Sequence, residues 1–139
     1  MECELCQPPA GPVLYQDEQL HVILVDEPGY PGFCRVIWKQ HVKEMTDLTL
    51  AEQQHLFRWV MLAEQALREV MQPTKINLAS LGNVVPHLHW HIIPRFADDA
   101  HFPSPIWAAA RREASGRVWP DLARQLQEAL ARLAATAKA

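Results

Sequence analysis

The sequence reads His87-Leu88-His89-Trp90-His91-Ile92-Ile93 where imidazole and apolar side chains alternate. Successive side chains of a β-strand point to opposite faces of its sheet, so this period predicts a strand over residues 88–93. Pro86 precedes the run and Pro94 follows it, which predicts that proline bounds the strand at both ends. The stretch therefore predicts that all three imidazoles share one face of a sheet.

Three chemical roles are open for this row of histidines. They could be solvated polar side chains, although a stack of protonatable rings stabilises nothing without a ligand. They could bind a metal, because neutral imidazoles are good zinc ligands. They could also support covalent catalysis, in which one imidazole attacks phosphorus and its neighbours hold the phosphate oxygens. We favour the third role, because it uses every residue of the row.

Short runs rich in β-branched residues and two amphipathic segments surround the histidine run. Four further strands are predicted, over residues 13–15, 21–25, 33–38 and 75–80. Thr49 and Glu52 form the capping box of a long helix predicted over residues 50–71. A C-terminal helix is predicted from Pro120 to about residue 135. This order predicts an α+β fold: an antiparallel sheet of about five strands, one long helix across it and a C-terminal helix.

Length and composition are those of one ordinary globular domain. The chain has 139 residues, of which 49% are hydrophobic and 21% charged. A net charge of −3 excludes the backbone of a nucleic acid as the main partner. No apolar run reaches the roughly 18 residues of a membrane span, and the N-terminal residues lack the pattern of a secretory signal. We therefore expect a cytoplasmic protein that does not interact with membranes.

The histidine run resembles the H-φ-H-φ-H-φφ signature of the histidine triad (HIT) superfamily of nucleotide hydrolases and transferases. Upstream blocks resemble the same family in order and spacing: Val25-Asp26-Glu27-Pro28, the segment from Pro31 to His41, and Asp47-Leu48-Thr49. The resemblance covers residues 3–96, and Ile92-Ile93-Pro94-Arg95 closes it. It implies one HIT-like domain over residues 1–139, with an extension and helix over residues 97–139, and pairing as a homodimer.

The resemblance also implies a reaction at the α-phosphate of a nucleotide conjugate, with purine nucleotides as substrates. His89, the middle histidine, corresponds to the family's nucleophile, which forms a covalent nucleotidyl-histidine intermediate. His91 would donate to the α-phosphate oxygens, and His87 would help to orient the nucleophile. A backbone carbonyl holds the other nitrogen of the nucleophile in the family. No redox cofactor is implied.

Further positions correspond to the family's nucleotide-binding residues. Asp26 falls where the family places an acid on the ribose hydroxyls, and Asn77 where an asparagine touches the phosphate side. The apolar Ile23 and Leu24 would flank the base. Arg95, directly after the motif, could meet either a phosphate or a carboxylate.

One departure from the family pattern bears on the leaving group. Family members commonly have Gln followed by Ser or Thr before the triad, whereas this chain has Asn83 and Val84. Asn83 still offers an amide donor, but the side chain of Val84 offers none. A good leaving group needs less protonation, so the departure favours dinucleoside polyphosphates over phosphoramidates. It also leaves open a weak or inactive nucleotide-binding module.

Three cysteines suggest a second site. Cys3 and Cys6 have the C-x2-C spacing that lets two thiolates share a tetrahedral ion, and two reduced thiols on a loop are the alternative. The resemblance implies that His41 and His87 complete a structural zinc site. Cys34 is predicted to be a small core residue.

Overall fold

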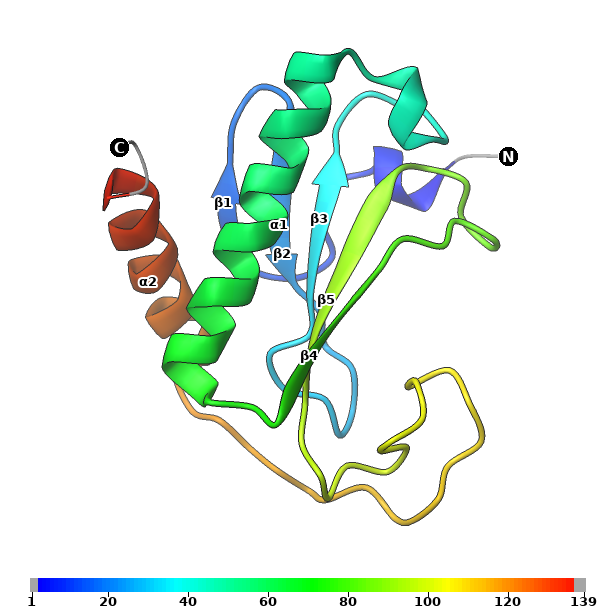
Figure 1. Cartoon of the computed structure of the whole chain (residues 1–139), viewed down its shortest axis with the longest axis vertical. Coiled ribbons are helices and arrows are strands. Elements are labelled where there is room, and N and C mark those ends of the chain that lie inside the picture. Colours follow the sequence, from blue (N-terminus) through cyan, green and yellow to red (C-terminus); the bar gives the residue numbers. More distant parts are fainter. Residues whose placement is uncertain (1–2, 137–139) are drawn as a thin grey trace.

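The predicted strands pair into one antiparallel sheet in the computed structural model, which describes residues 3–136 (Figure 1). The order of the strands is β1-β2-β3-β5-β4. Their bounds are β1 Val13–Gln16, β2 Leu20–Leu24, β3 Cys34–Trp38, β4 Lys75–Ala79 and β5 His89–Arg95. Two short 3-10 helices, η1 Glu4–Cys6 and η2 Met45–Asp47, lie in the connections. The five-stranded sheet and its helices confirm the predicted α+β fold.

Two α-helices complete the fold: α1 Leu50–Met71 and α2 Leu122–Thr136. The predicted capping box begins α1, because the Thr49 hydroxyl accepts from the Glu52 amide while the Thr49 amide donates to Glu52 Oε1. Pro120 does not begin α2 as predicted, since Asp121 has a φ of 63° and the helix starts after it. No helix within residues 3–136 has the length and apolar character needed to cross a membrane.

Helix α1 lies across one face of the sheet, with α2 beside it (Figure 1). Alternation along the strands turns Val22, Val36 and Ile92 to this side, where each is fully buried in one core with side chains of α1. Burying such an aliphatic side chain contributes about 1.5–3 kcal/mol each. The intervening residues point to the opposite face, which carries His89 and His91. We call this second side the histidine face.

Strand β5 extends beyond its predicted end. Its pairing with β3 stops at Cys34–Ile92, but its pairing with β4 continues through Ile76–Pro94 to the last pair at the end of the strand. The Arg95 carbonyl accepts from Thr74 beside β4, so the backbone of Pro94 faces the other side, where β3 has already left the ladder. The prediction that Pro94 ends the strand is therefore wrong, because its missing N–H removes no hydrogen bond there.

Loops cover part of the histidine face. Tyr30, Phe33 and Ile93 form a small second core there, and Ile106 packs against it from the irregular segment 96–118. That segment contains no helix or strand and forms an irregular loop beyond the end of β5 (Figure 1). These loops therefore form part of the surroundings of His89 and His91.

Candidate active site

His89 begins strand β5 and is 7% exposed. Its Nδ1 lies 2.5 Å from the backbone carbonyl oxygen of His87. A carbonyl only accepts, so Nδ1 carries the proton and donates, and Nε2 keeps its lone pair. Burial lowers the pKa of His89 below its ordinary value, and the positive charge of Arg35 lowers it further, against the opposing effect of the carbonyl. The ring is therefore a neutral imidazole with a nucleophilic Nε2 at about pH 7.

His91 packs edge-on against His89 across the histidine face. The two ring centroids are 4.8 Å apart, and His91 is 6% exposed. Burial, followed by the charges of His89 and Arg35, lowers the pKa of His91 to about 3. Nδ1 of His91 is buried without a hydrogen-bond partner among residues 3–136. A neutral ring with an unsatisfied nitrogen can bind one group of a ligand.

His87 does not belong to the row of imidazoles. Strand pairing begins only at His89, so the alternation of the strand does not reach His87. Its Nε2 donates to the Trp38 carbonyl at 2.6 Å, and its Nδ1 faces Cys3 and Cys6 at 3.4 and 3.5 Å. The prediction that three histidines share one face is wrong: two of them do, and the third joins the cysteines.

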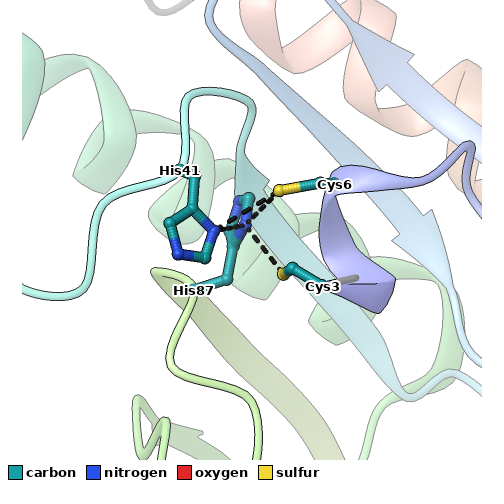
Figure 2. Close-up of side chains that lie close together, drawn as sticks. All are labelled: Cys3, Cys6, His41 and His87. Carbon is teal, nitrogen blue, oxygen red and sulfur yellow. Dashed lines mark hydrogen bonds between the residues drawn. The ribbon is translucent and has the colours of Figure 1, made fainter. Parts of the chain in front are cut away.

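Four potential metal ligands meet between the N-terminal segment and the start of β5 (Figure 2). The donor atoms of Cys3, Cys6, His41 and His87 all lie within 4.8 Å of one another. Because the Trp38 carbonyl holds the proton of His87 on Nε2, the Nδ1 lone pair points into this cluster. Two sulfur and two nitrogen donors suit tetrahedral zinc, so the residues fit the ion. His89 and His91 are not members of this cluster.

Cys34 lies apart from the metal cluster. It is 1% exposed in the core on the α1 side of the sheet, which confirms the predicted core role. Complete burial raises the pKa of its thiol to about 12. Cys34 is therefore a neutral apolar residue rather than a ligand.

Asn77 and Ile23 both lie on the histidine face. Asn77 pairs with Ile93 in the ladder between β4 and β5, and its Oδ1 accepts from Arg95 at 2.8 Å. Ile23 pairs with Arg35 of β3, which in turn pairs with His91. Leu24 follows Ile23 along β2 and therefore points to the α1 side. The structure brings Ile23 and Asn77 to the candidate site but does not bring Leu24 there.

Asp26 and Asn83 lie on exposed loops. Asp26 borders a cavity of about 560 Å³ with Leu24 and Trp119, and His89 is not among the residues that line it. Neither the Asp26 carboxylate nor the Asn83 side-chain amide makes a hydrogen bond with residues 3–136. Beside His89 lies a smaller cavity of about 250 Å³, which Gly82 and Ser80 help to line. The structure therefore does not bring Asp26 and Asn83 into contact with the histidines.

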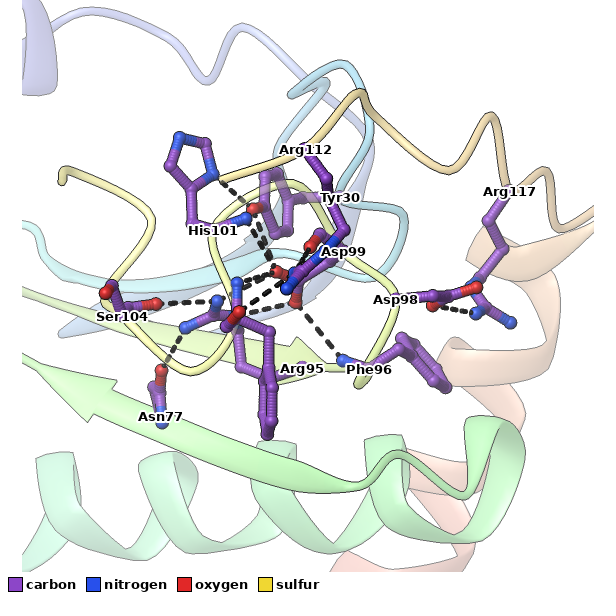
Figure 3. Close-up of polar contacts among 11 residues, drawn as sticks. Tyr30, Asn77, Arg95, Phe96, Asp98, Asp99, His101, Ser104, Arg112 and Arg117 are labelled. Carbon is purple, nitrogen blue, oxygen red and sulfur yellow. Dashed lines mark hydrogen bonds and ion pairs between the residues drawn. The ribbon is translucent and has the colours of Figure 1, made fainter. Parts of the chain in front are cut away.

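A buried ion pair that the sequence did not predict stands at the end of β5 (Figure 3). Arg95 is 2% exposed, and its Nε and Nη2 donate to the two carboxylate oxygens of Asp99 at 2.8 and 2.9 Å. Burial raises the pKa of Asp99, but hydrogen bonds from Arg95 and three backbone amides outweigh this and lower it to about 2. Of the two partners open for Arg95, the carboxylate is the one observed.

The same ion pair anchors the loop that carries Trp107. Asp99 accepts from the backbone amides of His101 and Phe102, and Arg112 donates to the Asp99 carbonyl at 2.6 Å (Figure 3). The loop places the Trp107 ring, 51% exposed, with its centroid 5.2 Å from that of His91. Trp107 is thus a wall of the candidate site. In the sequence, the only sign of this arrangement is that Arg95 and Asp99 are four residues apart.

Comparisons with known proteins agree with this geometry. Residues 10–98 match the HIT domain. The AP-4-A phosphorylase of Mycobacterium tuberculosis is 28% identical over 127 residues, which are 87% of this chain and 62% of that protein. The bis(5'-adenosyl)-triphosphatase of Saccharomyces cerevisiae is 30% identical over 90 residues, or 60% of this chain and 44% of that protein. The chain thus spans about three fifths of the mycobacterial relative and less of the yeast one.

Solved structures show the same fold. A histidine triad protein from Bradyrhizobium japonicum superposes with a TM-score of 0.69 and 28% identity, covering 86% of this chain and 87% of that one. A zinc-bound histidine triad family protein from Mycobacterium smegmatis gives a TM-score of 0.67 and 26% identity, covering 96% of both chains. With its HIT domain match over most of the chain and its paired histidines on one sheet face, this protein belongs to the HIT domain family.

Proposed function

We propose that this protein is a nucleotide phosphohydrolase or nucleotidyl transferase that acts at the α-phosphate of a nucleotide conjugate. The observation that carries the proposal is the hydrogen bond from His89 Nδ1 to the His87 carbonyl, which leaves Nε2 free to attack. The names of the mycobacterial and yeast relatives favour bis-adenosyl polyphosphates as the substrate class. The absence of a hydroxyl at Val84 favours the same good leaving groups.

The reaction would take two displacements. In the first, the Nε2 lone pair of His89 forms a bond to the α-phosphorus, and the bond to the leaving oxygen breaks with its electron pair on that oxygen. The neutral His91 ring would donate its N–H to a non-bridging oxygen and stabilise the added negative charge. In the second, water attacks phosphorus, the P–N bond breaks and Nε2 recovers its lone pair. The overall products are the leaving group freed in the first step, a nucleoside monophosphate and a proton; another acceptor in place of water gives transfer.

The remaining sequence-based roles are part of the same proposal. Asn77 would bind on the phosphate side and Ile23 beside the base, since both lie on the histidine face. Asp26 would bind the ribose and Asn83 the phosphate, and their exposed side chains are available to a ligand. Leu24 would act from the Asp26 cavity, which it helps to line.

A structural zinc ion at Cys3, Cys6, His41 and His87 is also proposed. The ion would supply no chemistry to the reaction, but it would hold the His87 ring and so the position of the carbonyl that orients His89. The zinc-bound mycobacterial neighbour supports this assignment.

We further propose that the protein is a cytoplasmic homodimer. Strand β4 is at an edge of the sheet and offers unpaired backbone groups. Phe57, Met61 and Leu78 are large apolar side chains that stay 37–45% exposed on β4 and α1. A second copy of the chain would cover them.

Intact-mass spectrometry of quenched reactions tests the function. The wild type, incubated with adenosine and guanosine conjugates, is expected to gain the mass of one nucleoside monophosphate transiently. His89→Ala is expected to lose both this adduct and turnover. His55→Ala is the control, because His55 lies on α1 and pairs with Asp17 rather than with the site. Turnover that persists in His89→Ala would contradict the mechanism, and tight nucleotide binding without turnover in the wild type would favour the inactive binding module.

A further inference from the structure

Two neighbouring residues of the histidine face each carry an unsatisfied polar atom. The register of β3 and β5 pairs Arg35 directly with His91, so their side chains share that face. Arg35 Nε and His91 Nδ1 are both buried and have no hydrogen-bond partner among residues 3–136. The other such side-chain atom in the described part of the chain belongs to Trp59 on α1, on the opposite side of the sheet. Buried polar atoms are normally paired, so these two atoms call for a ligand.

The guanidinium of Arg35 makes no ion pair and no hydrogen bond with residues 3–136. It lies over the Phe33 ring, with Cζ 5.6 Å from the ring centroid. Burial lowers the pKa of Arg35, while the nearby exposed carboxylates of Glu4 and Glu27 raise it without touching the group. Arginine remains charged at about pH 7 even so. The face therefore holds one positive charge that no carboxylate of residues 3–136 contacts directly.

Arg95 lies on the same face, and its guanidinium, unlike that of Arg35, is hydrogen-bonded to the protein. Its guanidinium donates to both oxygens of Asp99, to Asn77 and to the Ser104 carbonyl. Four of its five N–H donors are thus engaged by the protein, and its charge is paired with Asp99. His89 Nδ1 donates to the His87 carbonyl, and burial keeps His91 neutral by lowering its pKa to about 3. Among these groups, Arg35 is the one whose charge is not paired with a carboxylate and whose donors are free for an anion.

We propose that Arg35 binds a second phosphate group of the substrate, next to the phosphate that His89 attacks. Guanidinium donors match two phosphate oxygens in a bidentate fashion, and such charge-assisted bonds are among the strongest hydrogen bonds in proteins. Stacking of the guanidinium on a base would leave the in-plane Nε–H unpaired, so it does not explain the buried donor. The substrate class is therefore a nucleotide with two or more linked phosphates. This inference rests on the proposed function for the identity of the reacting phosphate.

Calorimetric titration with AMP and ADP separates the second phosphate from the first. The His89→Ala background prevents turnover, and in it ADP is expected to bind about tenfold more tightly than AMP. Adding Arg35→Gln is expected to make the two affinities similar, because it should weaken the binding of ADP and leave the binding of AMP nearly unchanged. Arg35→Lys should keep part of the preference, because it keeps the charge but loses the bidentate geometry. Arg68→Gln, an exposed arginine on α1, should keep all of it.

Steady-state kinetics give a second readout. In an otherwise wild-type chain, Arg35→Gln is expected to raise KM about tenfold for diadenosine tetraphosphate. KM should change little for an AMP p-nitrophenyl ester, which has a single phosphate. Thermal unfolding of the variants shows whether they are folded, and Arg35→Lys serves the same test if Arg35→Gln is not.

Three outcomes overturn the inference. If Arg35→Gln weakens the binding of AMP and ADP equally, Arg35 contacts the reacting phosphate. If it weakens the binding of neither nucleotide, the role of Arg35 is structural. An ADP preference that survives Arg35→Gln would assign the second phosphate to another residue. If the wild type turns over no conjugate but Arg35 controls the ADP preference, the proposed function fails while the phosphate site stands.

Discussion

His87 orients His89 through its backbone carbonyl, while its own imidazole points away toward Cys3 and Cys6. One residue thus belongs to two groups at once: its carbonyl sets the tautomer of the candidate nucleophile, and its ring belongs to the metal cluster. Any change that moves the His87 ring is expected to reach His89 through two residues of backbone. The metal cluster and the histidine face are therefore mechanically coupled.

Removing the thiolates is expected to remove the metal. Wild-type protein should contain about one equivalent of zinc per chain, and Cys3→Ser/Cys6→Ser should contain almost none, because two imidazoles alone bind zinc weakly. Atomic emission of protein purified in metal-free buffer measures this. Cys34→Ala is the control, since that buried thiol lies outside the cluster. Zinc retained by the double variant would rule out the Cys/His cluster as its site.

The pH profile of the reaction is expected to reflect the burial of His89. Attack needs the neutral ring, and burial moves the pKa of His89 below its ordinary value of 6.5. A base with a lowered pKa stays deprotonated to lower pH, so kcat/KM should stay level from about pH 8 to about pH 6.5 and fall only below that. Stopped-time assays with a dinucleoside polyphosphate across this range measure the profile. A fall of kcat/KM on the acidic side with its midpoint above pH 6.5 would contradict the assignment of His89 as the attacking group.

Breaking the buried ion pair is expected to destabilise the fold. Asp99→Asn leaves the charge of Arg95 buried without its counter-ion, which should lower the free energy of unfolding by about 3 kcal/mol. Urea unfolding measures this. Asp98→Asn removes the neighbouring carboxylate, which is 63% exposed and pairs with Arg117, and should cost less than about 1 kcal/mol. Equal effects of the two substitutions would show that burial of Asp99 is not what makes its ion pair important.

Trp107 is expected to report ligand binding. Its ring touches His91 yet is half exposed, so a nucleotide on the histidine face should change its environment. Nucleotide added to His89→Ala should quench tryptophan fluorescence, and Trp107→Phe should remove most of the quench while keeping the aromatic wall. Trp119→Phe, on the far side of the segment in the Asp26 cavity, is the comparison. A quench that depends on Trp119 instead would place the ligand in that cavity.

Features of the molecule that depend on near neighbours in the chain were predictable from the sequence. The strand at His89 and His91 followed from alternation, and helix α1 followed from its capping box and apolar period. The metal cluster was anticipated too, but only because a family resemblance linked Cys3 and Cys6 to histidines far along the chain. Patterns of period 2 and 3.6 determine which residues share a face of one element, and that much holds without knowledge of the neighbours.

Only the tertiary structure decided which faces meet and where each strand begins to pair. His87 does not share a face with His89 and His91, because strand pairing starts only at His89. Pro94 is part of the strand, because β3 no longer pairs with β5 at that position. The placement of Arg35 opposite His91 depends on the register between two strands that are distant in the sequence. That register is set by burial of the α1 side of the sheet as a whole, and a shift of one residue would have turned Arg35 to the core. The sequence patterns therefore predicted the fold, and the family resemblance pointed to the candidate nucleophile, whereas the charge beside it came from packing that no local pattern encodes.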